Sequence, residues 1–263
     1  MRWIIALVCM AQSAPSAGEK TTVTVKSTLE LDIVVRDGSG ESTRLLQLVR
    51  DDKFSQEVLD VADGRARSVR VKCLASTIQK TGSDVLPETK SSPLADRTYT
   101  ATRGANGWIA KDDEGGAPPA EAQTLGAWND LVTLVPKEMK EGAQWQVKDL
   151  DVLGLIYPSV LTEGNGQLNC SCELLQGNRA TITFKGQIAG RGKDESTTTL
   201  VITQGRLMLE GGKPKQLFLN GGLQSTIDVV DVQRKPNENV EEKRKVGEIQ
   251  IRSRRLEATF DFN

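Results

Sequence analysis

The fold is decided by short stretches in which apolar and polar residues alternate, such as Ala180-Thr181-Ile182-Thr183-Phe184-Lys185. Successive side chains of a β-strand point to opposite faces, so a period of two predicts a strand with one apolar and one polar face. The same alternation occurs in residues 22–26, 29–35, 68–72 and 248–252. We therefore expect a mainly β protein.

Glycine-containing turn signals separate these stretches at short intervals. They fall at residues 37–40, 63–64, 106–107, 177–178, 190–192 and 211–212. Strands joined by tight turns pair with their neighbours in sequence. The spacing predicts a large antiparallel meander that forms an open barrel or a sandwich.

One segment departs from the strand pattern. Between residues 120 and 135, Leu125, Trp128 and Leu131 recur at helical spacing, and Pro136 follows. We expect a helix here that caps an open end of the barrel or lies on the sheet, with Trp128 packed in the core. A second, shorter helix is expected over residues 151–157.

Two hairpins resemble each other and raise the question of internal duplication. Gly64-Arg65-Ala66 leads into a strand that ends at Lys72, and Gly177-Asn178-Arg179-Ala180 leads into one that ends at Lys185. Duplication would give two related lobes, 18–118 and 119–263, whereas chance similarity between hairpins explains the match equally well.

The N-terminus has the order of a secretory signal peptide. Arg2 precedes an apolar run over residues 3–11, and small residues follow up to Ala17. The run is shorter than the roughly 20 residues that span a bilayer, and Cys9 follows Val8, where a lipoprotein signal has a small residue. We expect residues 1–17 to be removed and 18–263 to be exported as a soluble periplasmic or extracellular protein.

Composition argues against several classes of partner. The 263 residues include 34 basic and 35 acidic side chains, for a net charge of −1, so neither nucleic acid nor an acidic membrane surface is indicated. Aromatic residues make up 4% of the chain, too few for a surface that stacks sugars or bases.

Three cysteines remain once Cys9 leaves with the signal peptide. Cys170 and Cys172 would point to one face of a strand, so either could form a disulfide with Cys73. The alternative is three buried thiols.

No catalytic, cofactor-binding or metal-binding residues are predicted. The chain has no histidine, which excludes Ser-His-Asp and Cys-His systems and histidine metal ligands. The run 190–194 lacks the glycine and the Ser or Thr of a phosphate loop. The acidic runs at 112–114 and at Asp228 and Asp231 lack calcium-loop spacing and are interpreted as surface charge.

The run Leu134-Val135-Pro136-Lys137-Glu138-Met139-Lys140-Glu141-Gly142-Ala143-Gln144-Trp145 is the most distinctive in the chain. It resembles a segment of uncharacterised exported bacterial proteins with β-rich repeated lobes, in which a proline, a glycine and a tryptophan introduce a strand. The resemblance implies a β-rich fold and an exported setting, and no catalytic residues.

Together these features predict a non-enzymatic exported binding or assembly protein whose ligand the sequence does not identify. One alternative is a carrier that holds a lipid or other apolar molecule in an open barrel, with residues 120–135 as its lid. Another is an enzyme that uses only carboxylates and lysines.

Overall fold

A computed structural model describes residues 14–104, 107–119, 121–122, 125–136, 138–148, 163–191, 196–234 and 241–263. They form a single 12-stranded antiparallel sheet with the order β6-β5-β3-β2-β1-β12-β11-β10-β9-β8-β7, and β4 pairs with β3 outside this path. The strands are β1 (Lys20–Asp37), β2 (Gly40–Ala62), β3 (Arg65–Gly82), β4 (Val85–Ser91), β5 (Thr98–Gly104), β6 (Gly107–Asp112), β7 (Gln144–Val147), β8 (Glu163–Gln176), β9 (Arg179–Arg191), β10 (Thr197–Glu210), β11 (Lys213–Arg234) and β12 (Glu241–Phe262).

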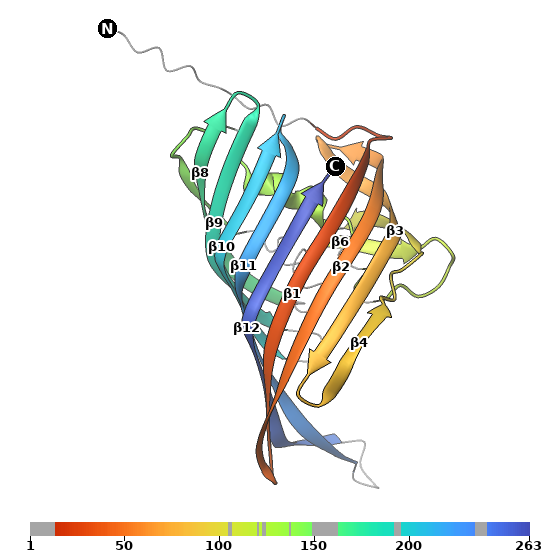
Figure 1. Ribbon diagram of the computed structural model, residues 1–263, viewed down its shortest axis with the longest axis vertical. Coiled ribbons are helices and arrows are strands. Elements are labelled where there is room, and N and C mark those ends of the chain that lie inside the picture. The colour runs from red at the N-terminus through yellow and green to blue at the C-terminus, as the bar shows by residue number, and fades with distance from the viewer. Residues whose placement is uncertain are drawn as a thin grey trace.

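The strand order consists of two meanders joined in the middle of the sheet. The first runs outward from β1 and the second runs outward from β12, and the pairing of β1 with β12 connects them (Figure 1). The sheet curves without closing, because β6 and β7 end the path at opposite edges. This arrangement confirms the predicted mainly β, open antiparallel fold.

The two predicted lobes are continuous through this sheet. Residues 18–118 contain the first meander and 119–263 the second, and β1 pairs with β12 along most of its length, with one register shift between Glu30 and Leu31. Relationship by duplication stays a prediction.

Most predicted turns connect strands as expected. Asp37 pairs with Gly40 across the β1–β2 turn, and the turns at 63–64, 177–178 and 211–212 close three further hairpins. The turn expected at 190–192 is wrong in its first part, since β9 continues through Arg191 and pairs there with Thr197. Backbone pairing on both sides overrides the glycine at position 190.

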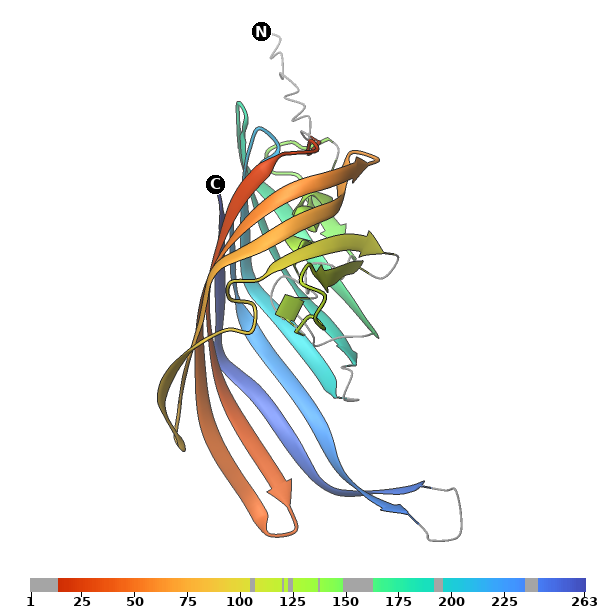
Figure 2. The same cartoon turned by 90° about the vertical axis from the view of Figure 1, so that its right-hand side faces the viewer.

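The predicted helix over 120–135 is shorter than expected. It is a 3-10 helix, η2 (Ala127–Leu134), that starts after Gly126, whose left-handed backbone (φ 97°) ends the preceding turn. The face of the sheet that curves around η2 is called the inner face, and the opposite one the outer face (Figure 2). The second predicted helix, at 151–157, lies outside the described residues.

The hydrophobic core lies between η2 and the inner face of the sheet. Leu131 and Leu134 of η2 are fully buried and belong to the same core cluster as strand residues such as Val23, Phe184 and Leu217. Burial of a large aliphatic side chain contributes about 1.5–3 kcal/mol, so η2 is held chiefly by its apolar residues.

Candidate functional site

Further along β1, β2, β11 and β12, away from η2, the inner face carries a band of apolar side chains. Residues directly opposite each other on antiparallel strands point to the same face. Leu31 lies opposite Leu46, and Ile33 lies opposite Ile251. We call this band the lower inner face, and its members are Leu31 and Ile33 and Val35 of β1, Leu46 and Leu48 of β2, Ile227 of β11, and Ile249 and Ile251 of β12.

The lower inner face lies next to the hydrophobic core on the same face of the sheet, and its residues are not part of the core cluster. Leu29 is the last residue of β1 that packs against the core cluster, and none of the members of the lower inner face does so among the described residues. All of them except Leu31 are partly exposed. Contiguous apolar surface of this kind marks a binding site more often than isolated exposed residues do.

Near η2, by contrast, the inner face is filled with side chains. The Trp128 ring lies 5.7 Å from that of Phe54, and its Nε1 donates a hydrogen bond of 2.5 Å to Gln56 Oε1. Asn129 contacts the same Gln56 through its amide group. The predicted packing role of Trp128 is confirmed.

A buried carboxylate fixes the start of η2 to the edge strands. Asp130 accepts a hydrogen bond of 2.7 Å from Trp108 Nε1 of β6 and forms an ion pair with Arg103 of β5. Both oxygens therefore have partners, which offsets the cost of removing this charge from water.

A small polar cluster lies between the core and the lower inner face. Arg50 Nε donates to Asp52 Oδ2 at 2.5 Å, and Ser76 donates to the other oxygen of Asp52. Burial raises the pKa of Asp52, while Arg50 and Ser76 act in the opposite direction. The cluster belongs to the inner face, because Asp52 lies opposite Val25 and Arg50 lies opposite Ser27.

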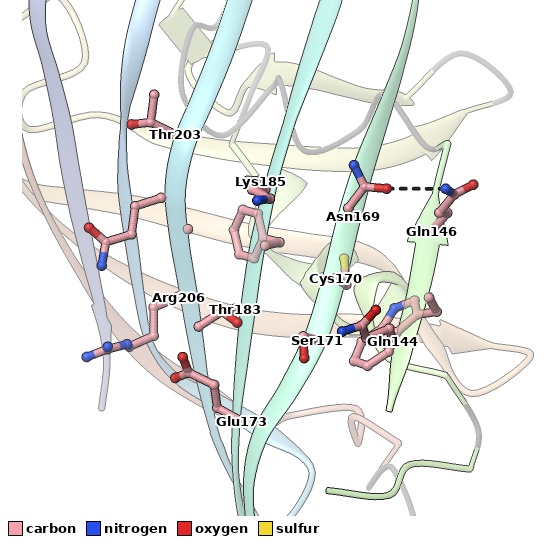
Figure 3. A pocket seen from close by; sticks show the side chains of 14 residues that line it. Gln144, Gln146, Asn169, Cys170, Ser171, Glu173, Thr183, Lys185, Thr203 and Arg206 are labelled. Carbon is pink, nitrogen blue, oxygen red and sulfur yellow. Dashed lines mark hydrogen bonds between the residues drawn. The ribbon is translucent and has the colours of Figure 1, made fainter. Parts of the chain in front are cut away.

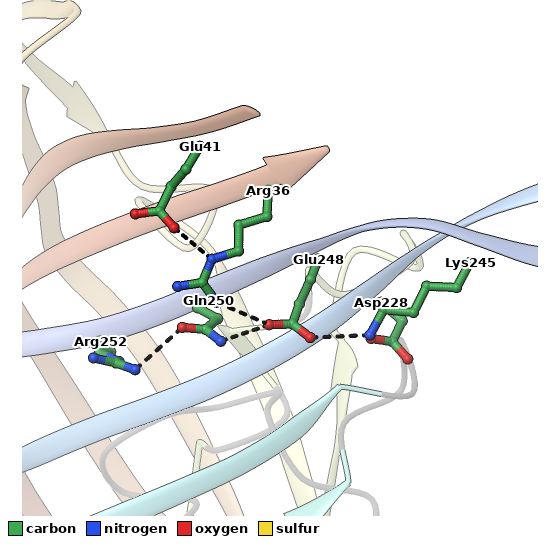
Figure 4. Close-up of polar contacts among 7 residues, drawn as sticks. All are labelled: Arg36, Glu41, Asp228, Lys245, Glu248, Gln250 and Arg252. Atoms are coloured by element: carbon green, nitrogen blue, oxygen red, sulfur yellow. Dashed lines mark hydrogen bonds and ion pairs between the residues drawn. The ribbon is translucent and has the colours of Figure 1, made fainter. Parts of the chain in front are cut away.

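The outer face behind the lower inner face is polar. Glu248 accepts hydrogen bonds from Lys245 and Gln250, and its Oε1 lies 3.7 Å from Arg36 Nη1 (Figure 4). Arg36 also forms an ion pair with Glu41. These contacts lower the pKa of Glu248, with the bond from Lys245 as the largest cause. In this region the inner face of these strands is thus mainly apolar, with Arg44 opposite Ile33 as a charged residue on it, and the outer face is charged.

A pocket of about 680 Å³ lies on the outer face of β7–β10 (Figure 3). One row across it consists of Gln144, Ser171, Thr183 and Arg206, which lie in register. Beside this row, Gln146 Nε2 donates to Asn169 Oδ1 at 3.2 Å. The pocket offers amides and hydroxyls on an open surface, and we assign it no chemistry.

A second pocket, of about 260 Å³, lies at the end of the molecule where β1 begins and β12 ends. Trp128 and Phe262 form part of its wall, and Lys20, Arg65 and Lys215 line it as well. Lys213, another lining residue, is paired with Glu19 at 2.6 Å.

The three cysteines for which a disulfide was predicted lie on two strands. Cys73 lies on β3, and Cys170 and Cys172 lie on β8; all three are buried and free. Burial raises the pKa of Cys73 and of Cys170 to about 11 and also raises that of Cys172. A disulfide between Cys73 and Cys170 or Cys172 stays a prediction.

The acidic runs are engaged by basic side chains. Asp112 is buried and pairs with Arg97 at 3.1 Å, and Asp228 pairs with Lys245 at 2.5 Å. Across the described ranges, no group of three or more acidic, cysteine or histidine side chains is placed to hold a metal ion. A helix with the length and apolar character to cross a bilayer is likewise not found in the described part of the chain.

Sequence reasoning missed the lower inner face and the polar cluster above it. The alternation in residues 29–35 and 248–252 predicted the apolar faces, yet pairing between the first and last strands was needed to join them. No sequence signal distinguishes Arg50 from the exposed arginines of other strands.

No protein-family model and no curated protein sequence matches the chain. Among solved structures, lipovitellin is similar with a TM-score of 0.48 and 9% identity over 94% of this chain, which spans only 25% of the lipovitellin chain. An outer-membrane channel from Pseudomonas putida F1 has a TM-score of 0.25 and 8% identity, over 96% of this chain and 98% of that one.

An outer-membrane lipoprotein-sorting protein domain from Vibrio parahaemolyticus has a TM-score of 0.15 and 11% identity, over 88% of this chain and 84% of that one. Because all three TM-scores are below 0.5, none of these similarities assigns a family or an activity to this chain.

Proposed function

We propose that this protein binds an elongated apolar molecule, such as a lipid acyl chain, on the lower inner face. The observation that carries the proposal is the band of partly exposed apolar side chains that extends the inner face beyond the core. A water-exposed apolar band on one side of a sheet costs free energy that a bound apolar ligand recovers.

The dimensions of the lower inner face fit such a ligand. From Leu31 to Val35 the lower inner face follows four residue steps of β1, or about 13 Å at the usual rise per strand residue. One leaflet of a bilayer core is about 15 Å thick, so most of the length of an acyl chain can lie along the face.

The expected affinity is moderate. Burial of about ten methylene groups would contribute about −8 kcal/mol, which corresponds to a Kd near 1 μM before the cost of ordering the ligand is included. We therefore expect micromolar or weaker binding.

The absence of histidine and the pairing of Asp52 and Asp130 with arginines support a binding role rather than catalysis. We propose that the protein is a non-enzymatic binding protein and that it acts after export.

The predicted signal peptide at 1–17 falls largely outside the described residues. N-terminal sequencing of the protein recovered from its native compartment tests export, which a chain that still begins at Met1 would contradict.

The binding proposal is tested with a fluorescent acyl-chain probe and a pair of matched variants. Ile33→Asn places a polar group on the lower inner face, whereas Val34→Asn changes the next residue of the same strand on the outer face. Ile33→Asn should weaken binding about tenfold, which is about 1.4 kcal/mol, and Val34→Asn less than twofold. Equal binding by both variants, or no binding by the unmodified protein, would overturn the proposal.

A further inference from the structure

Arg50 lies on the inner face of β2, directly beside the band of apolar residues. The other arginine on this face of β2 is Arg44, which lies opposite Ile33, is 65% exposed and pairs with the exposed Asp84. Arg50 has different surroundings. The register partners of Arg50 are Ser27 of β1 and Ile78 of β3, and Leu48 of the lower inner face is two positions away on the same side of β2. Ser27 in turn lies opposite Ala258, a buried core residue. Arg50 thus stands where the core ends and the lower inner face begins.

The guanidinium group of Arg50 is only partly used by the protein. Its Nε donates to Asp52, and the two Nη groups have no hydrogen-bond or ion-pair partner among the described residues. The Arg50 side chain is 21% exposed and that of Asp52 is 5% exposed, so the arginine is the member of the pair that a ligand can reach.

Arginine is suited to a second anionic partner. It presents five N–H donors in a planar fork, and it binds a carboxylate through two parallel hydrogen bonds. Asp52 receives the Nε–H bond, which holds the group in place and leaves the Nη donors for another acceptor.

We propose that the ligand of the lower inner face is a long-chain carboxylic acid whose carboxylate binds the Nη groups of Arg50. This inference rests on the proposed function and specifies the polar end of the ligand. The acyl chain would follow β1 from Ser27 toward Val35, a distance of about 26 Å at the usual rise per residue. Leu29, Leu31 and Ile33 would contact the chain along this path.

The polar cluster explains why Arg50 is available in an otherwise apolar place. Ser76 and Arg50 both donate to Asp52, so the carboxylate holds the arginine from the side of the core. Asp52 thereby keeps the guanidinium from turning toward solvent on the face of β2 that it shares with Leu48. A positioned charge of this kind selects ligands by their headgroup, whereas the apolar residues select by chain length.

The test compares oleate with oleyl alcohol, which has the same chain and no charge. Both are titrated against the unmodified protein and against three variants: Arg50→Lys, the double variant Arg50→Met with Asp52→Asn, and Arg252→Met. The double variant removes both charges together, so that it does not leave Asp52 as an unpaired buried carboxylate. Arg252 is an exposed arginine on the outer face and serves as the matched control.

We expect the unmodified protein to bind oleate at least tenfold more tightly than oleyl alcohol. The double variant should lose this preference while it binds oleyl alcohol within twofold of the unmodified protein. Arg50→Lys should keep part of the preference, because its charge remains and its fork geometry is lost. Arg252→Met should bind both ligands as the unmodified protein does.

Equal affinity of the unmodified protein for oleate and oleyl alcohol would overturn the role of Arg50 and leave the proposed apolar site intact. So would a double variant that keeps the preference for oleate. If neither compound binds to a folded protein, the proposed function itself fails. Circular dichroism of each variant establishes that it is folded.

Discussion

The inner face of the sheet has two parts that are built from the same strands and have different surroundings. Near η2, Val23 of β1 and Phe260 of β12 are at most 3% exposed and belong to the core. Farther along the same strands, Ile33 and Ile251 are partly exposed and lie outside the core cluster. Both parts show the same alternation of apolar and polar residues. The buried part therefore differs from the proposed binding face in the elements that pack on the strands, and not in its sequence pattern.

The largest difference between the two parts should appear on truncation of apolar side chains. Leu131→Ala removes a fully buried side chain of η2 and should lower the free energy of unfolding by about 2–5 kcal/mol. Ile33→Ala, on the lower inner face, should lower it by less than about 1 kcal/mol, because its surroundings are already partly water. Urea unfolding of both variants measures the difference, and equal losses would show that Ile33 is part of the core.

Polar residues should show the same contrast on a smaller scale. Asp130→Asn weakens the buried contacts with Trp108 and Arg103 and should cost about 1–3 kcal/mol. Glu248→Gln, in the outer-face network, should leave the urea midpoint unchanged within error, since water and salt screen exposed pairs. A large loss in Glu248→Gln would mean that the polar network supports the long strands.

Cysteine reactivity provides a third comparison, between folded and unfolded protein. With a pKa of about 11, Cys73 and Cys170 carry thiolate in only about one molecule in a thousand at pH 8. Their reaction with a disulfide reagent should therefore be slow in the folded protein and should accelerate about tenfold per unit of pH.

The same reagent counts thiols after unfolding. The protein that begins near residue 18 should release three equivalents in denaturant if all three thiols are free, as in the structure. A single equivalent would show that two of the three cysteines form a disulfide, and peptide mapping would then identify whether Cys73 is one of them.

The smallest expected effect concerns the pH dependence contributed by Asp52. Burial raises its pKa in the folded protein above the unfolded value, so the folded state binds this proton more tightly. The associated stability is fully present below the unfolded pKa and is lost as pH rises through the folded pKa. The Asp52→Asn variant should therefore show a smaller fall of unfolding free energy with rising pH above about 4. A steeper fall would show that the pairing with Arg50 outweighs burial.

The sequence predicted local features of this fold better than long-range ones. Alternation placed residues 29–35, 180–185 and 248–252 in strands, and most glycine turns proved to be hairpins. These features depend on neighbours in sequence, whose side-chain directions follow from backbone geometry. The helix was placed too early because Leu125 extends the helical spacing, whereas the left-handed Gly126 determines where η2 begins.

The candidate site could not be predicted in the same way. It requires Leu46, Ile33 and Ile251 to share one face, and their register follows from the pairing of β1 with both β2 and β12. Nor does the sequence show that Arg50 is partly buried beside Asp52, whereas Arg44, on the same face of the same strand, is exposed and pairs with Asp84. Tertiary pairing therefore supplies the information that alternation lacks.

The position of the last strand at the centre of the sheet has a consequence for the order of folding. β12 pairs with β1, and the two are separated along the chain by about 200 residues that ribosomes add in about 10–40 s. During that interval the first meander ends in the unpaired edge of β1, so Leu31, Ile33 and Val35 have a partner strand, β2, on one side only. Contacts so distant in sequence form slowly even in the complete chain. We therefore expect the β1–β12 pairing, which completes the proposed binding face, to form late in folding and to be a step at which the incomplete sheet is open to aggregation.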